Sequence, residues 1–564
     1  MMKKKMIPVI VAVALIILIV CIAGGKSLLE RFAYSKEYRD LNSYFDITNA
    51  SDVAIDMNHE IIDTKAKMSE GSVYLDYPSV CSLLNSRFYV DEHESLLIMT
   101  TSTDVIKHTI GTNSYIMGGE EKSMEAPVTM TNGDTLYINL DYVKLFTNLS
   151  YEVFHDPERI VLRTSWGNIK LATIKKNTAV RYQGGYKSDI LRDLEKEEVV
   201  TILEEMEDWD KVETADGIIG YVEKRYLADI TETEEIPVTD YQDEFVAQTR
   251  DYKINMSWHA IYATSGNDTF DEVVNGTGTM SIICPTWFTL SDNDGNYRSF
   301  ASSGYVEKAH SRNMEVWPTV DNFNIEGIKT YEVMSYTSKR DRLVSALMSE
   351  ALSLGIDGFN LDFELVPTEA VPHYVQFIRE LSVACRREGL VLSVDNYPPQ
   401  GGSNYNLSEQ GVFCDYVVIM GYDEHWAGCN EAGSVASIGY VEDGISLVIG
   451  QGVPENKIIN AIPFYTRLWK TNNGEVTSEA LDMATAANFI SNNSVPVSWD
   501  EVTCQNYGEK EMNGILYQIW LEDAQSIETK LTVMSKYNLA GVASWRLGHE
   551  DKSIWSVIDA YVKR

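Results

Sequence analysis

The part of the chain from residue 250 onward alternates short apolar runs with longer amphipathic segments. Eight apolar runs are predicted as strands, with helices such as those at 340–353 and 374–388 between them. The predicted strands lie at residues 254–257, 279–284, 315–320, 358–364, 390–394, 416–421, 458–462 and 541–545. This pattern predicts a (β/α)8 barrel over residues 250–564, with an inserted α+β subdomain near 470–520.

One predicted strand carries two acidic side chains on one face. Residues 357–364 have the sequence Asp-Gly-Phe-Asn-Leu-Asp-Phe-Glu. Because side chains alternate along a strand, the two phenylalanines and the leucine share one face, and Asn360, Asp362 and Glu364 share the other. Two acids inside a barrel cost desolvation and repulsion, which disfavours a purely structural role. The alternative, an edge strand with a solvated acidic face, conflicts with the continuous apolar face.

A carboxyl pair at the mouth of a barrel predicts acid–base chemistry. One acid would have its pKa raised by its neighbour, and the other would stay ionised. Glycoside hydrolysis is the reaction class that most often needs such a pair. His259, His425 and His549 are scattered without metal-ligand spacing, so we expect neither a metal site nor a cofactor.

The octapeptide resembles the Asp-x-x-Asp-x-Asp-x-Glu signature of glycoside hydrolase family 18, with Asn360 in place of the second Asp. Three more segments are similar to pieces of that family: Met-Gly-Tyr-Asp at 420–423, Pro-Phe-Tyr-x-Arg-x-Trp at 463–469, and Ser-Trp-Arg-Leu-Gly at 544–548. The sequence looks most like the branch of bacterial cell-wall and spore-cortex N-acetylglucosaminidases. The Ser-x-Gly-Gly motif typical of chitinases is replaced by Trp-Pro-Thr-Val at 317–320, which puts chitinase specificity in doubt.

The resemblance implies a role for each matching residue. Glu364 would be the general acid and then the base, while the substrate's own 2-acetamido oxygen attacks the anomeric carbon and gives an oxazolinium intermediate with retention. Asp362 would orient the acetamide N–H and stabilise the positive charge. Tyr422 would hydrogen-bond the acetamide oxygen, and Asp423 would hold the sugar. Trp545 would form the floor under the distorted sugar.

Five other residues are candidates for contacting or supporting the substrate. Asn360 would hydrogen-bond the aspartate two positions later without adding a third negative charge. Arg467 belongs to the motif at 463–469 and is a candidate substrate-binding residue. Trp287, Tyr397 and Trp426 follow predicted strands, on the barrel face that carries active sites, and are candidate platforms for stacking on sugars. For Tyr422 and Trp545, the alternative is an ordinary place in the barrel core.

Residues 1–26 are predicted to hold the chain in a membrane. Lysines at 3–5 precede an uncharged run over residues 7–23. Seventeen residues make about 26 Å of helix, enough for a thin hydrocarbon core and longer than the roughly 7–15 residues of a secretory h-region. The alternatives are a cleaved signal peptide, because small residues occupy 23–25, and lipidation at Cys21. An anchor or a signal peptide would place everything after Lys26 outside the cytoplasm.

Residues 44–170 contain a degenerate repeat with an offset of 63. Val-Tyr-Leu at 73–75 and Leu-Tyr-Ile at 136–138 each begin a predicted unit of one strand, a short helix and a strand pair. The two units resemble the duplicated module named after the amino-terminal domain of copper amine oxidases, although no ligand cluster for copper is present. We therefore expect an α+β spacer or protein-contact domain.

Residues 172–228 alternate short apolar runs with charged and turn residues, which predicts a small β-barrel. Trp-Asp-Lys-Val at 209–212 and Gly-Tyr-Val at 220–222 resemble a bacterial SH3-type module, a frequent cell-wall-binding partner of hydrolases. The alternative is a structural barrel without a ligand. Residues 229–249 are predicted to form an acidic linker.

The charge of the chain limits its partners. Its 83 acidic and 47 basic residues give a formal net charge of −36, which repels phosphate backbones and argues against nucleic-acid binding. Together the segments predict a cell-surface hydrolase, membrane-anchored or secreted to the wall, that cleaves β-1,4 bonds next to N-acetylglucosamine in peptidoglycan. The alternatives are a non-hydrolytic glycan-binding or wall-tethering protein and a chitinase acting on chitin oligomers.

Overall fold

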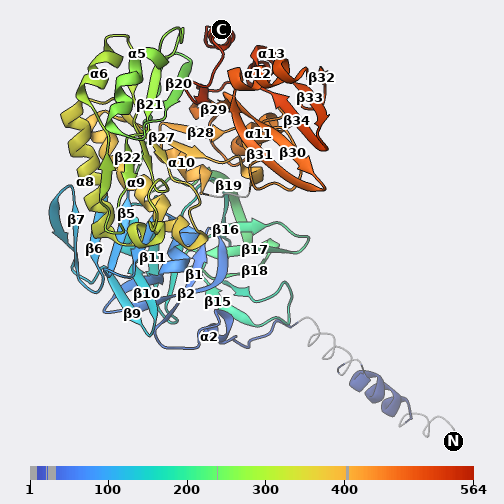
Figure 1. The fold of residues 1–564 in the computed structure, drawn as a ribbon. Helices are drawn as coiled ribbons and strands as arrows, with labels where there is room; N and C mark the ends of the chain where they lie inside the picture. Colours follow the sequence, from blue (N-terminus) through green and yellow to red (C-terminus); the bar gives the residue numbers. More distant parts are fainter. Residues whose placement is uncertain are drawn as a thin grey trace, which may run out of the picture. The chain divides into compact units, whose positions relative to one another are not determined.

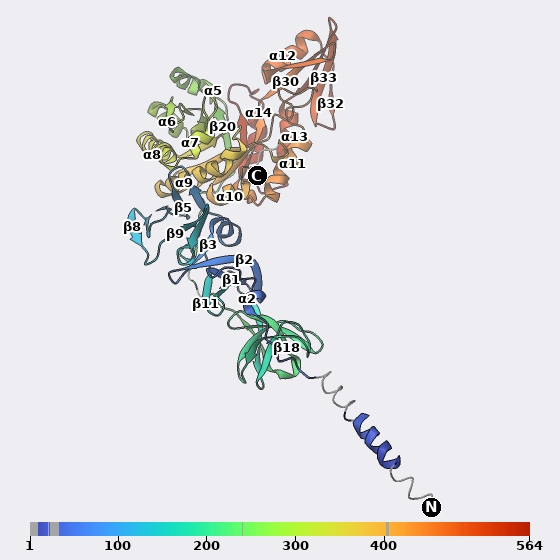
Figure 2. The ribbon, with the colours of Figure 1, turned by 90° about the horizontal axis from the view of Figure 1, so that it is seen from below.

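The computed structural model describes residues 9–20, 22, 33–237, 239, 241–401 and 405–563. The chain forms two compact units. The first contains the chain up to Phe88 together with residues 108–243, and the second contains residues 89–107 and everything from Glu244. Figures 1 and 2 show that the first unit consists mainly of strands, whereas the second mixes strands with helices.

Residues 9–20 form a helix inside the predicted anchor. Within the described part of the chain, no helix is long and apolar enough to cross a membrane, so these residues do not support the predicted transmembrane helix. Apart from Ile22, the other residues of the predicted segment at 1–26, including Cys21 and the small residues at 23–25, lie outside the described residues.

The first sheet of unit 1 contains most of the predicted repeat, but not the strand pair of the first copy, which belongs to a separate sheet. Its strand order is β11-β12-β1-β2-β3-β10-β9. The strands are β1 (Asp52–Met57), β2 (Glu60–Ser69), β3 (Ser72–Asp76), β9 (Thr129–Asn132), β10 (Thr135–Asn139), β11 (Ser150–Phe154) and β12 (Arg159–Arg163). The helical turns Tyr77–Ser79 and Val80–Leu84 follow β3, and α4 (Leu140–Lys144) follows β10. The first strands of the two copies pair antiparallel, with Leu75 opposite Ile138, so both copies contribute to one sheet.

An all-β module follows in unit 1, with the strand order β15-β14-β18-β17-β16-β13-β19. The strands are β13 (Asn168–Ile174), β14 (Thr178–Arg181), β15 (Ile190–Leu194), β16 (Val199–Glu204), β17 (Trp209–Thr214), β18 (Ile219–Glu223) and β19 (Leu227–Glu234). Val180, Val212 and Val222 are fully buried in its core. The alternation of apolar and charged runs thus forms short antiparallel strands around an aliphatic core, as predicted.

Unit 2 is built on parallel strands in the order β25-β26-β27-β28-β29-β35-β20-β21-β24. The strands are β20 (Ile254–His259), β21 (Ile282–Pro285), β24 (Glu315–Val316), β25 (Thr319–Asp321), β26 (Gly358–Asp362), β27 (Val391–Asn396), β28 (Tyr416–Met420), β29 (Ile458–Pro463) and β35 (Gly541–Trp545). The third predicted strand comprises β24 and β25. Because β24 pairs with β21 and β25 pairs with β26, the ring of strands closes into the predicted barrel.

Two strands differ from the prediction. The third is interrupted at Trp317 and Pro318, because proline has no N–H to donate to a neighbouring strand. The second begins at Ile282 rather than at residue 279, because the preceding residues form turns, as in the bond from the Met280 N–H to the Thr277 carbonyl (3.2 Å).

Helices surround the strands of the barrel (Figure 1). They are α5 (Phe270–Val273), α6 (Ser303–His310), α7 (Thr330–Met334), α8 (Thr337–Leu354), α9 (Val371–Glu388), α10 (Leu407–Phe413), α11 (Ile438–Gly450), α13 (Ala524–Met534) and α14 (Ile554–Val562). The residues of β20, β27 and β29 are all buried, as expected for parallel strands between a packed interior and a helical layer. Gly355 and Gly389 end the two longest of these helices in the left-handed conformation, which glycine adopts without strain.

The segment predicted as an insertion forms a second, antiparallel sheet between β29 and β35. Its strand order is β31-β30-β34-β33-β32. The elements are β30 (Tyr465–Asn472), β31 (Glu475–Asp482), α12 (Met483–Asn493), β32 (Val497–Asp500), β33 (Gln505–Met512) and β34 (Ile515–Leu521). Leu468, Ala486 and Ile519 form its small core.

Residues 89–107 lie within the first copy of the repeat but belong to unit 2. Asp91 accepts hydrogen bonds from the backbone N–H (2.7 Å) and the hydroxyl (2.6 Å) of Thr337, where α8 begins. The Gln376 amide in α9 donates to the Thr100 hydroxyl at the end of β5 (Leu96–Thr100), at 3.0 Å. The sequence analysis, which placed these residues only in the spacer at 44–170, did not predict that they pack on the barrel helices.

Candidate active site

The polar face of β26 points into the barrel. Asn360 is fully buried and bonded to side chains of three other strands. Its Oδ1 accepts from Trp258 Nε1 (2.8 Å) and Thr319 Oγ1 (3.3 Å), and its Nδ2 donates to Ser393 Oγ (3.1 Å) and Asp395 Oδ1 (2.7 Å). The prediction that Asn360 hydrogen-bonds Asp362 is wrong. Residues two apart on one strand are separated by about 7 Å, whereas neighbours on adjacent strands are about 5 Å apart.

Three aspartates from neighbouring strands converge beneath the mouth of the barrel. Asp321 ends β25, Asp362 ends β26 and Asp395 lies in β27, and all three are buried. Burial raises the pKa of Asp362 well above its usual range, and the negative charges of Asp395, Glu364 and Asp321 raise it further. Burial likewise raises the pKa of Asp395. Asp362 Oδ1 and Asp395 Oδ2 have no hydrogen-bond partner within the described part of the chain, so burial disfavours a negative charge on both carboxyls at once.

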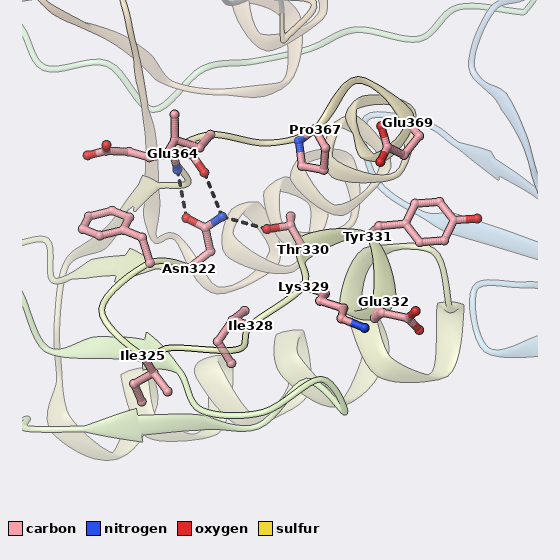
Figure 3. Close-up of a pocket in the computed structure, with 12 residues that line it drawn as sticks. Asn322, Ile325, Ile328, Lys329, Thr330, Tyr331, Glu332, Glu364, Pro367 and Glu369 are labelled. Carbon is pink, nitrogen blue, oxygen red and sulfur yellow. Dashed lines mark hydrogen bonds between the residues drawn. The ribbon is translucent and has the colours of Figure 1, made fainter. Parts of the chain in front are cut away.

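Glu364 lies just beyond the end of β26 and is held through its backbone by Asn322. The Glu364 N–H donates to Asn322 Oδ1 (2.9 Å), and Asn322 Nδ2 donates to the Glu364 carbonyl (3.0 Å) and to Thr330 Oγ1 (2.8 Å), as Figure 3 shows. The Asn322 amide therefore connects the loop after β25 and the start of α7 to Glu364, whose carboxyl is half-buried.

The pKa of the Glu364 carboxyl is raised above its usual value. Burial is the largest cause, the hydrogen bond from the Tyr397 hydroxyl lowers the pKa, and the negative charges of Asp423 and Asp321 raise it. Burial thus raises the pKa of both acids of this strand, Glu364 and Asp362, whereas the sequence predicted a raised pKa for one of them.

Tyr422 and Asp423 follow β28 on the same side of the barrel mouth as Tyr397. The Tyr465 hydroxyl donates to Asp423 Oδ1 (2.6 Å), and the rings of Tyr422 and Tyr465 pack edge to face with centroids 6.1 Å apart. Burial raises the pKa of the Tyr422 phenol well above its usual value, so this hydroxyl keeps a proton that it can donate.

Two cavities share Leu365, which lines both and is 80% exposed. The first has a volume of about 610 Å³, and its lining includes Asn322, Phe323, Lys329, Tyr331, Glu364 and Glu369 (Figure 3). The second has a volume of about 970 Å³, and its lining includes Tyr397, Tyr405, Tyr422, Asp423, Trp426 and Tyr440. Such neighbouring cavities beside a carboxyl suit an extended ligand with apolar faces and polar edges.

Several predicted site residues face these cavities or lie near them. Tyr397, Tyr422, Asp423 and Trp426 line the second cavity, and Trp426 is 57% exposed, as a stacking platform requires. Trp545, at the end of β35, is half-buried, and its ring packs against Trp258 with centroids 5.9 Å apart.

Other predicted residues lie away from the cavities. The prediction for Trp287 is wrong: its ring is fully buried against Tyr305, and its Nε1 donates to Asn267 Oδ1 (2.9 Å), so it cannot stack on a sugar. Asn360 is equally buried, so it supports its acidic neighbours from below. Arg467 lies in β30, where it donates to Ser478 Oγ (3.3 Å), and it lines neither cavity.

The sequence analysis missed Asn322, Asp321, Asp395 and Tyr465. Asp321 and Asp395 could have been found, because both lie toward the carboxyl ends of barrel strands, where active-site residues of this fold gather. The contact between Asn322 and Glu364 joins residues 42 apart and leaves no local signal in the sequence. Among the described residues, no group of three or more His, Cys, Asp or Glu side chains is arranged to hold a metal ion.

Residues 244–550, more than half of the chain, match the sequence model of the Glycosyl hydrolases family 18. The chain belongs to glycoside hydrolase family 18. Residues 176–228 match the bacterial SH3 domain, and residues 55–164 match the copper amine oxidase N-terminal domain. The three resemblances found in the sequence are thereby confirmed, and the chain is a glycoside hydrolase.

The family 18 domain has several named relatives. It is 24% identical over 314 residues to the uncharacterized glycosylase YvbX of Bacillus subtilis (strain 168), a match that covers 53% of this chain and 89% of that protein. It is 27% identical over 255 residues to the putative sporulation-specific glycosylase YdhD of the same organism, covering 43% of this chain and 60% of the relative. A cortical fragment-lytic enzyme of Bacillus anthracis is 23% identical over 255 residues, covering 43% of this chain and 59% of the relative.

Two solved structures share the fold of the family 18 domain. The C-terminal domain of a putative chitinase from Desulfitobacterium hafniense DCB-2 has a TM-score of 0.51 and 17% identity, covering 55% of this chain and 100% of that one. A chitinase from Chromobacterium violaceum ATCC 12472 has a TM-score of 0.50 and 21% identity, covering 55% of this chain and 99% of that one. At these identities the likeness supports the barrel fold alone.

Proposed function

We propose that this family 18 hydrolase cleaves β-1,4 bonds next to N-acetylglucosamine in peptidoglycan by a retaining, substrate-assisted mechanism. The observation that carries the proposal is the Glu364 carboxyl, which is partly buried at the end of β26, has a raised pKa and borders a cavity. A carboxyl with a raised pKa keeps its proton closer to neutral pH, as a general acid requires.

In the proposed reaction, Glu364 donates its proton to the glycosidic oxygen while the bond from that oxygen to the anomeric carbon breaks. The substrate's 2-acetamido oxygen attacks the anomeric carbon from the other face and forms the oxazolinium ion. Glu364, now ionised, takes a proton from the water that opens the ring with retention. The chain therefore needs no nucleophile of its own.

The neighbouring residues suit the remaining roles. Asp362 has a buried oxygen without a partner among the described residues, and this oxygen can accept the acetamide N–H. The Tyr422 hydroxyl can donate to the acetamide oxygen, because its raised pKa keeps it protonated. Asp423, positioned by the Tyr465 hydroxyl, can hold a sugar hydroxyl, and Trp545 can form the floor of the subsite.

The bacterial SH3 domain and relatives named as cortical fragment-lytic enzymes support peptidoglycan as the substrate. The same observations support a site of action at the wall, outside the cytoplasm, in agreement with the prediction from the amino-terminal sequence. Comparing turnover of purified muropeptides with turnover of chitin oligomers tests this choice. Faster turnover of chitin oligomers would favour the chitinase alternative.

The catalytic role of Glu364 is tested by Glu364→Gln, which keeps the shape of the side chain but removes its titrating proton. We expect turnover of an N-acetylglucosamine oligomer to fall by at least about a thousandfold, with binding retained, because general acid catalysis contributes about 10²–10⁴-fold and the same group also activates the water. Product formation is followed by mass spectrometry and binding by calorimetry.

Glu369→Gln is the matched control, because Glu369 is an exposed acid that lines the same cavity. It should keep nearly full activity. Normal turnover by Glu364→Gln would contradict the mechanism. A substrate without the N-acetyl group should be inert, and its cleavage at an equal rate would instead point to a carboxylate nucleophile.

A further inference from the structure

The SH3-like module of unit 1 has an edge strand that is already covered. β15 is the last strand of its sheet, and such an edge normally leaves backbone N–H and C=O groups free for another chain. Here the chain's own segment at 35–39 pairs with Tyr186 and with Ile190, the first residue of β15. The Ser35 N–H donates to the Tyr186 carbonyl (2.7 Å), the Ile190 N–H to the Glu37 carbonyl (2.8 Å), and the Arg39 N–H to the Ile190 carbonyl (2.8 Å). The segment therefore forms a single parallel β-bridge with the module, in which Tyr38 pairs with Ile190.

The side chain of Tyr34 lies in a site built from several elements of the module. Its ring packs edge to face on Tyr186, with centroids 5.1 Å apart, and the Arg181 guanidinium lies 5.1 Å from its centroid. Its hydroxyl donates to Glu223 at the end of β18 and accepts from Arg225 in the turn that follows. The site thus supplies an aromatic wall, a cation over the ring, and both a donor and an acceptor for a phenol.

Two more side chains of the segment have partners in the module. The Tyr38 hydroxyl donates to Asp193 Oδ2 (2.6 Å), and the Arg39 guanidinium stacks on Tyr182, 3.8 Å from the ring centroid. The Arg181 guanidinium also donates to the Ser35 carbonyl (3.1 Å). Backbone pairing and side-chain contacts therefore recognise the same stretch of six residues.

We propose that the SH3-like module is a receptor for an extended peptide with the pattern Tyr-x-x-x-Tyr-Arg, and that residues 34–39 of the same chain are its resident ligand. A ligand tethered in the same chain has an effective concentration in the millimolar range, so a free peptide must exceed that concentration to displace it. The module accordingly holds residues 34–39, which occupy the start of its β15 edge at Ile190. This inference does not depend on the proposed hydrolytic function.

Hydrogen–deuterium exchange on the full chain tests whether the segment occupies the site. The amides of Ser35, Arg39 and Ile190 should exchange slowly in the wild-type protein, and at least about tenfold faster in the variant Tyr34→Ala/Arg39→Ala. Tyr262→Ala, which removes a 70% exposed tyrosine from unit 2, is the control and should leave their exchange unchanged. Fast exchange of these amides in the wild-type protein would overturn the proposal.

A labelled peptide of residues 33–39, Ala-Tyr-Ser-Lys-Glu-Tyr-Arg, tests recognition. In anisotropy titrations the Tyr34→Ala/Arg39→Ala chain should bind this peptide and not a scrambled one, while the wild-type chain should bind it at least about tenfold more weakly. An unchanged melting temperature of the variant shows that it is folded. Equal binding by both chains would mean that the site is open, and no binding by the folded variant would mean that the module does not recognise the segment; either result overturns the proposal.

Discussion

Tyr397 is the residue that most directly adjusts the acid strength of Glu364. Its hydroxyl donates to Glu364 Oε2, and this bond lowers a pKa that burial raises. A hydrogen bond to the charged form of a carboxyl favours ionisation, so removing the bond must raise the pKa further. Because a general acid works only while it is protonated, activity is present below this pKa and is lost as the pH rises through it.

Tyr397→Phe is therefore expected to move the alkaline limb of the kcat/KM profile to higher pH. Measuring kcat/KM for an N-acetylglucosamine oligomer across the neutral and alkaline pH range checks this. Tyr440→Phe is the control, because Tyr440 lines the same cavity and its hydroxyl has no bond to Glu364. A limb that moves to lower pH in Tyr397→Phe would contradict the assignment of the proton to Glu364.

At the scale of elements, the end of β26 and the loop after β25 are joined by Asn322. The strand alternation visible in the sequence was enough to place Asn360, Asp362 and Glu364 on one face. It was not enough to find their partners. Asn322 comes from the loop after β25 and Asp395 from β27, and both meet this face only when the barrel closes. Strand ends were predicted less well than strands, since the break at Pro318 follows from how β24 and β25 pair with different neighbours.

Asn322→Ala should lower kcat by about thirtyfold, because it removes two hydrogen bonds to the Glu364 backbone worth about 1 kcal/mol each. KM should change little, because the Asn322 side chain positions Glu364 and is not itself the charged group. Thr330→Val removes the bond from Asn322 to Thr330 but leaves both Asn322 bonds to Glu364, so it should lower kcat less. Steady-state kinetics with melting temperatures checks this, and an unchanged kcat for Asn322→Ala would contradict it.

At the scale of the whole molecule, the barrel unit includes residues 89–107, which are distant in sequence from residue 244. Leu97, Ile98 and Met99 are fully buried, and the Tyr89 hydroxyl lies 3.4 Å from Arg340, whose buried guanidinium pairs with Glu380 (2.8 Å). Without these residues, part of this apolar and charged surface would be exposed or left without a partner.

A chain limited to residues 244–564 is therefore expected to be less stable than the barrel of the full chain. Asp91→Ala in the full chain removes one of these contacts. It should lower the free energy of unfolding by about 1–3 kcal/mol, because it leaves the buried start of α8 without its hydrogen-bond acceptor. Glu94→Ala, which removes an exposed bond to the Ser338 N–H, should cost less. Thermal unfolding of the short chain and of the two variants checks these expectations. Equal melting temperatures for the barrel in the short and full chains would contradict the prediction.

The sequence by itself determined the barrel, the two preceding modules and the strand that carries Asp362 and Glu364, because these follow from local periodicity and short motifs. The tertiary structure decided which residues meet. It buried Trp287, paired Asn360 with Asp395, placed Asn322 on the Glu364 backbone, joined residues 89–107 to the barrel and placed residues 34–39 at the start of β15. Each of these contacts joins parts of the chain far apart in sequence, and only the packing of complete sheets and helices brings them together.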